Sequence, residues 1–118
     1  DTSRARPPAP VWVIDRRRRQ LLSPGGDVVD LTRQELTLCL MFAESPEHSV
    51  TRVAQLERLY GRDDESARRA LDTTMSRLRR KISDATGETP PILTDYGVGH
   101  SFSQPLELLD TGQPLLRA

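Results

Sequence analysis

The chain has 118 residues with 17 basic and 17 acidic side chains, and hydrophobic residues make up 36% of it. This composition fits one compact domain, and the absence of any apolar run near the ~20 residues of a membrane span excludes a transmembrane segment here. The single cysteine, Cys39, excludes an intrachain disulfide and a cysteine-based zinc site, so we expect a cytoplasmic domain with no metal and no cofactor. Because the sequence begins with Asp1 rather than Met, we expect it to belong to a longer chain.

Strand-forming segments come first along the chain. Residues 1–10 contain three prolines and two arginines, which is typical of a linker or a frayed terminus. Residues 11–14, 20–22 and 27–31 are short β-prone runs joined by turns, and they predict three antiparallel strands. Four consecutive arginines, Arg16–Arg19, lie in the first of these turns. They fit a solvated turn and a phosphate contact equally well, and the sequence does not decide between the two.

Two helices are predicted next. Thr32 and Glu35 match the capping-box pattern, so the first helix begins there and runs to about Glu44. It is apolar on almost every side, which indicates a central, buried position. Thr51 is a second N-cap candidate, and the helix after it covers residues 52–60. The side chains of this second helix that we expect to point inward are Val53, Leu56, Leu59 and Tyr60.

The third helix is expected over residues 65–84 and has two distinct faces. At ~100° per residue, one stripe is apolar and consists of Leu71, Met75, Leu78 and Ile82. The opposite side combines short hydrogen-bonding side chains with arginines: Arg69, Asp72, Thr73, Ser76, Arg80 and Ser83. Such a face suits the major groove of DNA, because Asp, Thr and Ser approach base edges while Arg reaches guanine or phosphate oxygens.

The same helix concentrates positive charge. Residues 68–81 contain six basic side chains against one acid, Asp72, a balance of +5 in a chain whose net charge is zero. An amphipathic helix with a charged outer face is most often simply solvated, but such helices usually interleave acids with bases. We interpret the uneven balance as a sign of five uncompensated charges and an anionic partner.

A hairpin is predicted after the third helix. Residues 92–94 and 100–102 are its strands, and its turn contains Gly97 and Gly99. The two glycines lack the third glycine and the following helix of a dinucleotide-binding loop, so we interpret them as turn residues. The polar residues of the hairpin have no oxyanion site beside them, and the chain is not expected to be an enzyme. Strands, three helices and a hairpin in this order predict an α+β fold.

Several segments form a specific combination when they are taken together. They are Asp30–Leu36, Val50–Arg52, Leu59–Gly61, Arg69–Asp72, Met75–Ile82, Ile92–Thr94 and Gly97–Gly99. The combination resembles the OmpR/PhoB-type winged-helix DNA-binding domain, the effector domain of bacterial response regulators in two-component systems. The resemblance covers residues 11–102 and implies an N-terminal four-stranded antiparallel sheet, a winged helix-turn-helix of three helices, and a C-terminal hairpin wing. The fourth strand is expected near residues 44–51, and residues 103–118 form a tail to which we assign no role.

The resemblance also implies a site. The third helix lies in the major groove in that family, and the positions that match its base-facing residues are Arg69, Asp72, Thr73 and Ser76. The positions that match phosphate contacts are Thr74, Arg77, Arg79, Arg80 and Thr94. The wing contains Tyr96, Gly97, Gly99 and His100. It departs from the family at Tyr96, where an arginine is usual, and at His100, where an aromatic residue is usual, so its attraction to a narrow minor groove is expected to be weaker.

The resemblance implies that the partner is double-stranded DNA and that the role is transcription regulation. It also implies that two copies bind head to tail on a direct-repeat operator. The loop between the second and third helices matches a loop that touches RNA polymerase in some members, and here it contains Arg62, Asp63, Asp64 and Glu65. The alternative is a winged-helix adaptor that mainly binds a protein partner. The acidic loop, the tail, Tyr96 and the neutral total charge favour that alternative.

Overall fold

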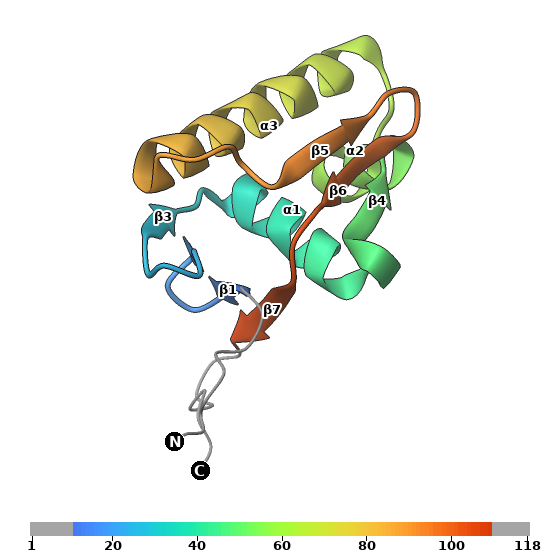
Figure 1. Ribbon diagram of the computed structural model, residues 1–118. Coiled ribbons are helices and arrows are strands. Elements are labelled where there is room, and N and C mark those ends of the chain that lie inside the picture. Colours follow the sequence, from blue (N-terminus) through green and yellow to red (C-terminus); the bar gives the residue numbers. More distant parts are fainter. Residues whose placement is uncertain (1–10, 110–118) are drawn as a thin grey trace, which may run out of the picture.

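The structure is a computed structural model that describes residues 11–109, so the expected linker and most of the tail lie outside the described residues. Three α-helices pack with two small sheets in the described part (Figure 1). The helices are α1 (Arg33–Glu44), α2 (Arg52–Tyr60) and α3 (Glu65–Thr86), and a short 3-10 turn, η1 (Pro46–His48), follows α1. The order of the elements confirms the predicted α+β class.

The strands form two separate sheets. The first has the order β3-β2-β1-β7, and its strands are β1 (Trp12–Asp15), β2 (Gln20–Leu22), β3 (Val28–Asp30) and β7 (Leu106–Leu109). β1, β2 and β3 are antiparallel, as predicted, with Ile14 opposite Leu21 and Leu21 opposite Val29. The second sheet has the order β4-β6-β5, and its strands are β4 (Ser49–Thr51), β5 (Ile92–Asp95) and β6 (Gly99–Phe102). β5 and β6 are the predicted hairpin.

The prediction for the fourth strand of the first sheet is wrong. β4 lies within residues 44–51, but it pairs with β6 in the second sheet. The fourth strand is β7, which runs parallel to β1 with Trp12 opposite Leu106, so the sheet is mixed rather than antiparallel. Burial of Leu106 and a hydrogen bond of 2.9 Å from the Trp12 N–H to the Pro105 carbonyl hold β7 in place. The folded part of the chain therefore continues at least to Leu109, past the expected boundary at Phe102.

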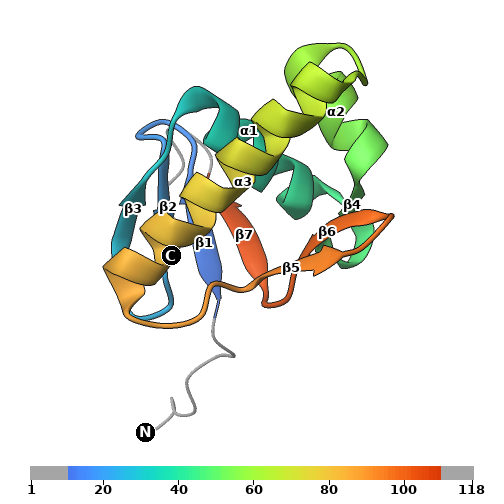
Figure 2. The ribbon, with the colours of Figure 1, turned by 90° about the horizontal axis from the view of Figure 1, so that it is seen from above.

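The core lies between the first sheet and the helices. α3 crosses above α1 and the sheet when the molecule is seen from above (Figure 2). All four residues of its predicted apolar stripe are at most 2% exposed: Leu71, Met75, Leu78 and Ile82. Phe102 joins the second sheet to this core, because its ring packs edge-on against Trp12 with 5.7 Å between ring centroids and tilted against Phe42 at 6.0 Å. Burial of these apolar side chains is the main favourable contribution to folding.

Local signals set the helix ends. The Glu35 N–H donates to Thr32 Oγ1 at 3.2 Å and the Thr32 N–H donates to Glu35 Oε1 at 2.9 Å, which is the predicted capping box. Thr51 caps α2 and Asp64 caps α3, each by accepting a backbone N–H three residues further on. α3 ends at Thr86 and is capped by Gly87, whose left-handed backbone (φ 74°) suits glycine. The starts of all three helices therefore agree with the sequence.

The buried face of α2 differs from the prediction at one position. Val53 was expected to point inward, but it is 59% exposed, whereas Gln55 is fully buried. Leu56 is buried as predicted, and Leu59 and Tyr60 are half-buried. Gln55 lies on the buried side of α2, where its Oε1 atom is 2.9 Å from His100 Nδ1 in β6. Sequence periodicity favours the apolar Val53 and does not reveal this contact between distant residues.

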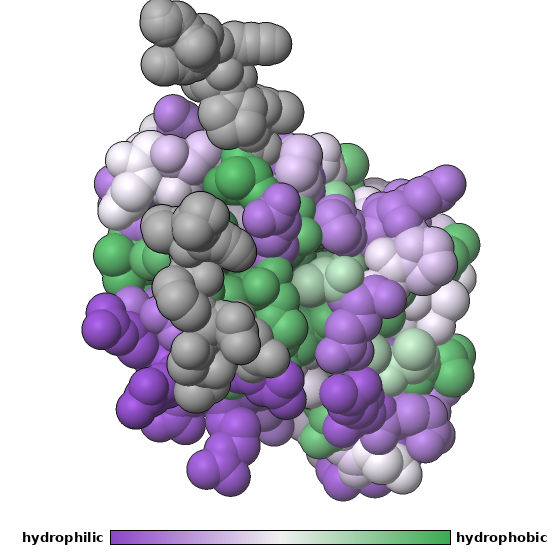
Figure 3. Space-filling model, turned by 90° about the horizontal axis from the view of Figure 1, so that it is seen from below, coloured by the Kyte–Doolittle hydropathy of each residue, from purple (hydrophilic) through white to green (hydrophobic). Residues whose placement is uncertain are grey.

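The surface of the described part is mixed. Seen from below, the face opposite α3 exposes hydrophobic residues among hydrophilic ones (Figure 3). Exposed large apolar residues include Val28 at 48% and Leu93 at 50%. Within residues 11–109, no helix has the length and apolar character that a membrane crossing requires.

Candidate nucleic-acid interface

The outer face of α3 brings together the residues expected to face DNA bases. Arg69, Asp72, Thr73 and Ser76 are exposed, and so is Arg80 one turn beyond Ser76. They share this face because the apolar stripe on the other side of the helix is buried in the core. Hydroxyl and carboxylate groups therefore lie beside guanidinium groups on one exposed surface, which can both accept and donate hydrogen bonds.

Ion pairs neutralise the loop between α2 and α3 and the first turn of α3. The pairs are Arg62 with Asp64 at 2.8 Å, Arg68 with Asp63 at 2.7 Å and Arg69 with Glu65 at 3.0 Å. The pKa of Asp64 is below its ordinary value, first because the Ala67 N–H donates to its carboxylate and then because Arg62 and Arg68 are close. The loop predicted to be acidic is thus balanced by neighbouring arginines.

Arg79 is directed toward the hairpin rather than toward solvent. Its guanidinium is half-buried and donates to the Ile92 carbonyl at 3.1 Å and to Thr94 Oγ1 at 2.5 Å. Arg79 and Thr94 are both expected phosphate contacts, and the structure brings the two side chains into contact with each other. The hairpin, which we call the wing, is therefore attached to α3 through a charge-assisted hydrogen bond.

Lys81 is also engaged inside the protein. Its ammonium group donates to Glu35 Oε1 at 2.7 Å and to the Asp30 carbonyl at 3.0 Å, and Glu35 is only 2% exposed. Among residues 11–109, Arg77 and Arg80 have no ion-pair partner, and both are exposed. The expectation of five uncompensated charges on this helix is wrong, because three of its six basic residues pair with acids: Arg68 with Asp63, Arg69 with Glu65 and Lys81 with Glu35.

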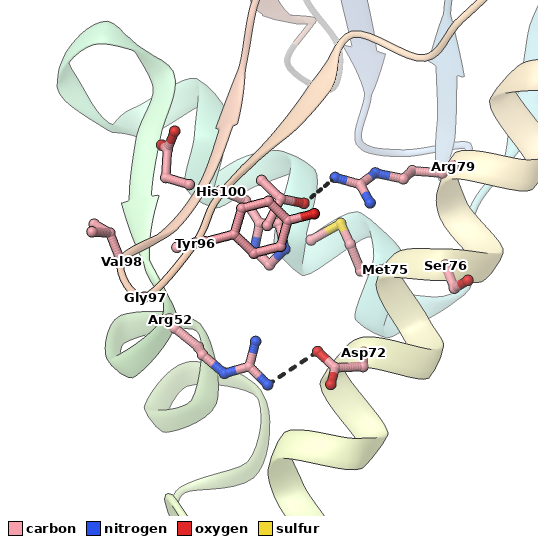
Figure 4. A pocket seen from close by; sticks show the side chains of 12 residues that line it. Arg52, Asp72, Met75, Ser76, Arg79, Tyr96, Gly97, Val98 and His100 are labelled. Carbon is pink, nitrogen blue, oxygen red and sulfur yellow. Dashed lines mark hydrogen bonds and ion pairs between the residues drawn. The ribbon is translucent and has the colours of Figure 1, made fainter.

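A cleft of about 370 Å³ lies between α3 and the wing (Figure 4). Asp72 and Ser76 line it from α3, and Tyr96 lines it from the wing. Arg52, the first residue of α2, lies in the same cleft with its Nη2 atom 3.0 Å from Asp72 Oδ1. The sequence does not single out Arg52 as a site residue, because its partner Asp72 is 20 residues away on another helix.

The turn of the wing is fixed to the start of α2. The Arg52 N–H donates to the Val98 carbonyl at 2.8 Å. Gly99 passes so close to the Val50 carbonyl that a Cβ atom at this position would overlap it, which explains why a glycine is required. Beyond this attachment the tip is open, and Tyr96 is 90% exposed. The wing therefore has a rigid base and an exposed aromatic tip.

His100 lies in β6 of the wing, as expected, but its side chain is buried at 4% exposure. Its Nδ1 atom lies 2.9 Å from Gln55 Oε1 on α2, and the Gln55 Nε2 atom has no hydrogen-bond partner among the described residues. Burial lowers the pKa of His100 below its ordinary value, and the positive charges of Arg79 and Arg52 lower it further. A neutral His100 thus joins the wing to α2 and is not a surface contact.

The side of α3 that faces α1 has a different character. Thr74 Oγ1 lies 3.4 Å from the Tyr60 hydroxyl and 3.3 Å from Gln34 Oε1, so these three polar groups form a cluster in which Thr74 and Tyr60 are half-buried and Gln34 is exposed. Arg77 and Arg33 line a shallow hollow beside this cluster, at the start of α1. The hollow combines a hydroxyl group with two exposed guanidinium groups, which is the chemistry that binds a phosphate oxygen.

Other chemistry finds little support in the described part of the chain. Cys39 is fully buried in α1, and burial raises the pKa of its thiol to about 12, so it is not a reactive nucleophile. Residues 11–109 contain no group of three or more His, Cys, Asp or Glu side chains placed to hold a metal ion.

Comparison with known proteins gives a consistent result. The sequence model of the family described as "Transcriptional regulatory protein, C terminal" matches residues 26–102. The aerobic respiration control protein ArcA of Escherichia coli K12 is 33% identical over 97 residues, which cover 81% of this chain and 40% of ArcA. The regulatory protein VirG of Agrobacterium tumefaciens is 33% identical over 101 residues, or 86% of this chain and 38% of VirG. The chain thus spans about two fifths of the length of these curated relatives.

Solved structures agree on the fold. The DNA-binding domain of Bacillus subtilis CssR is 27% identical with a TM-score of 0.59, and the match covers 76% of this chain and 97% of that one. The DNA-binding domain of Klebsiella pneumoniae RstA, solved in complex with the RstA box, is 29% identical with a TM-score of 0.60 and coverages of 76% and 88%. These matches confirm the winged-helix fold and the resemblance inferred from the sequence.

Proposed function

Since the chain belongs to the family of C-terminal domains of transcriptional regulatory proteins, we propose that it binds duplex DNA sequence-specifically as the effector domain of a response regulator. The observation that carries this proposal is the outer face of α3, where Asp72, Thr73 and Ser76 are exposed beside arginines. Short polar side chains reach base edges, and arginines reach guanine or phosphate. The complex of RstA with its DNA box supports the same role for this fold. We propose no enzymatic activity.

Within this proposal the residues divide into three groups. Arg69, Asp72, Thr73 and Ser76 face bases, with Arg52 orienting the Asp72 carboxylate through their 3.0 Å ion pair. Thr74, Arg77 and Arg80 contact phosphates on either side of the groove. Arg79 and Thr94 hold the wing against α3. In this position Tyr96, rather than the usual arginine, approaches the neighbouring minor groove or its sugar-phosphate edge.

The test is a randomised-site selection followed by binding measurements at several salt concentrations. We expect one preferred site, with affinity that falls steeply as salt rises because bound phosphates release counterions. Thr73→Ala and Ser76→Ala should change the preferred bases, whereas Arg77→Ala should weaken binding to all sequences and reduce the slope of log K against log salt by about 0.9. Undetectable duplex binding at low salt would overturn the proposal.

The arrangement on DNA, the cellular location and a contact with RNA polymerase are part of the same proposal. We infer that two copies bind a direct repeat head to tail, about one helical turn apart, and that the protein acts in the cytoplasm. The loop with Arg62, Asp63, Asp64 and Glu65 is the proposed contact with RNA polymerase. Its ion pairs give it a fixed pattern of both charges, which suits a specific protein contact better than a purely acidic loop would.

One observation favours the alternative, a winged-helix adaptor that binds protein. The wing tip exposes Tyr96 at 90% and Val98 at 57%, and Val53 on the neighbouring helix is 59% exposed. An apolar tip of this kind is more typical of a protein contact than of a DNA contact. If a partner protein bound equally well to wild type and to the double variant Arg77→Ala/Arg80→Ala, while Tyr96→Ser abolished its binding, the adaptor function would be supported.

A further inference from the structure

The turn between β1 and β2 is a second concentration of positive charge. Arg16, Arg17, Arg18 and Arg19 are all exposed. Among residues 11–109, only Arg18 of these four has an ion-pair partner, and its Nε atom is a distant 3.9 Å from Asp15 Oδ2. Arg16, Arg17 and Arg19 therefore add three charges that no neighbouring acid in the described part balances. None of these three arginines has a role in the proposed function.

The backbone at Arg19 supports a use for its side chain. Arg19 has φ 54°, in the left-handed region that disfavours residues with a Cβ atom. Its carbonyl accepts the Leu31 N–H at 2.8 Å, which fixes this conformation. A glycine would adopt the same backbone at lower cost, so an arginine at this position is not explained by the turn alone.

The turn lies beside the surface that faces DNA in the proposed function. The hydrogen bond from Leu31 to Arg19 places the turn next to the start of α1, as seen from above (Figure 2). Arg33 is the first residue of α1, is exposed, and lines the same hollow as Arg77 of α3. A basic strip, which we define as Arg16, Arg17, Arg19, Arg33 and Arg77, thus extends from α3 across the start of α1 to the first sheet.

We propose that this strip is a second backbone contact, in which Arg16, Arg17 and Arg19 bind phosphates of the same duplex outside the base pairs contacted by α3. The inference rests on the proposed function, because it places the strip on DNA whose position is set by α3. Guanidinium groups on a short turn suit this role, since they bind phosphate oxygens through paired N–H donors and tolerate any base sequence. The strip would extend the stretch of duplex that the protein contacts without adding sequence specificity.

The experiment compares wild type, the triple variant Arg16→Ala/Arg17→Ala/Arg19→Ala, the single variant Arg19→Gly and the matched control Arg58→Ala. Arg58 is an exposed arginine on α2, outside the strip. The probes are two duplexes that carry the selected site, one with long flanks and one trimmed to the selected base pairs. We expect the triple variant to reduce the salt slope on the long duplex by about 0.9 for each lost phosphate contact, and the control to leave it unchanged.

Three outcomes decide the inference. Wild type should bind the long duplex more tightly than the trimmed one, and the triple variant should bind both alike while keeping the same preferred bases. Arg19→Gly should lower the salt slope without lowering the melting temperature, which separates lost binding from a damaged turn. An unchanged slope and unchanged length dependence in the triple variant would overturn the inference even if wild type binds DNA, whereas failure of wild type to bind any duplex would overturn the proposed function instead.

Discussion

The inner flanks of α3 and its solvent-facing side use the same kind of residue for different purposes. Arg79 binds the wing and Lys81 binds Glu35, so both cations hold other elements against the helix. Arg77 and Arg80 lie on the same helix within four residues of them, yet both are exposed and unpaired within residues 11–109. The difference shows that a count of basic residues overstates the charge available to a partner. Lys81 is neutralised by Glu35, whereas Arg79 keeps its charge but uses its hydrogen-bond donors inside the protein, and Arg77 and Arg80 keep both charge and donors for a polyanion.

The largest expected effect comes from removing an inner cation. Lys81→Met leaves the carboxylate of Glu35, 2% exposed, without its ion-pair partner. We expect the free energy of unfolding to fall by about 2 kcal/mol, between the ~1 kcal/mol of exposed pairs and the ~3–5 kcal/mol of buried pairs that lose one partner. Urea unfolding measures this loss. A fall below about 0.5 kcal/mol would mean that Lys81 belongs with the outward cations.

Smaller effects are expected from the two single variants Arg79→Ala and Arg77→Ala, whose comparison tests the two sides of the helix directly. Arg79→Ala removes the hydrogen bonds to Ile92 and Thr94, so stability should fall by about 1 kcal/mol while the salt slope of DNA binding stays constant. Arg77→Ala should do the reverse, with stability unchanged within about 0.5 kcal/mol and a lower salt slope. Equal effects of the two variants on both measurements would contradict the comparison.

The smallest expected effect is a dependence of stability on pH through His100. The pKa of the buried imidazole is below the ordinary value of 6.5, so as the pH falls through 6.5 the unfolded chain binds a proton that the folded protein does not. The contribution of the neutral imidazole to the free energy of unfolding is therefore fully present above pH 6.5 and declines as the pH falls toward the folded-state pKa. Urea unfolding at pH 7.5 and 5.5 should show a weaker decline for His100→Gln than for wild type. Because His48 is present in both proteins, an identical decline would exclude His100 as the cause.

The helices were predictable because their signals are local. The capping box joins Thr32 to Glu35, and α3 is recognisable from apolar residues three and four positions apart. Such interactions depend on residues within one helical turn, so sequence spacing is sufficient to detect them. The exposed outer face of α3 follows from the same spacing.

The wing residues were predicted less well, because burial there depends on which helix lies below the hairpin. His100 and Tyr96 are four residues apart in one hairpin, yet one is 4% exposed and the other 90%. Contact with Gln55 on α2 decides the position of His100. No local pattern distinguishes these two residues, since alternation along a strand tells which side chains share a face but not what covers that face.

By itself, the sequence determined the helix ends, the buried stripe of α3, the hairpin and the family of this protein, because each depends on short-range spacing or on motifs. Only the tertiary structure decided that β7 completes the first sheet beside β1, that Arg52 pairs with Asp72, and which basic side chains of α3 have no partner among residues 11–109. These features join residues far apart in the chain, such as Lys81 and Glu35 with 46 positions between their numbers. These contacts form only once the core has packed and has brought the two residues close together. They therefore leave no pattern in a short stretch of sequence.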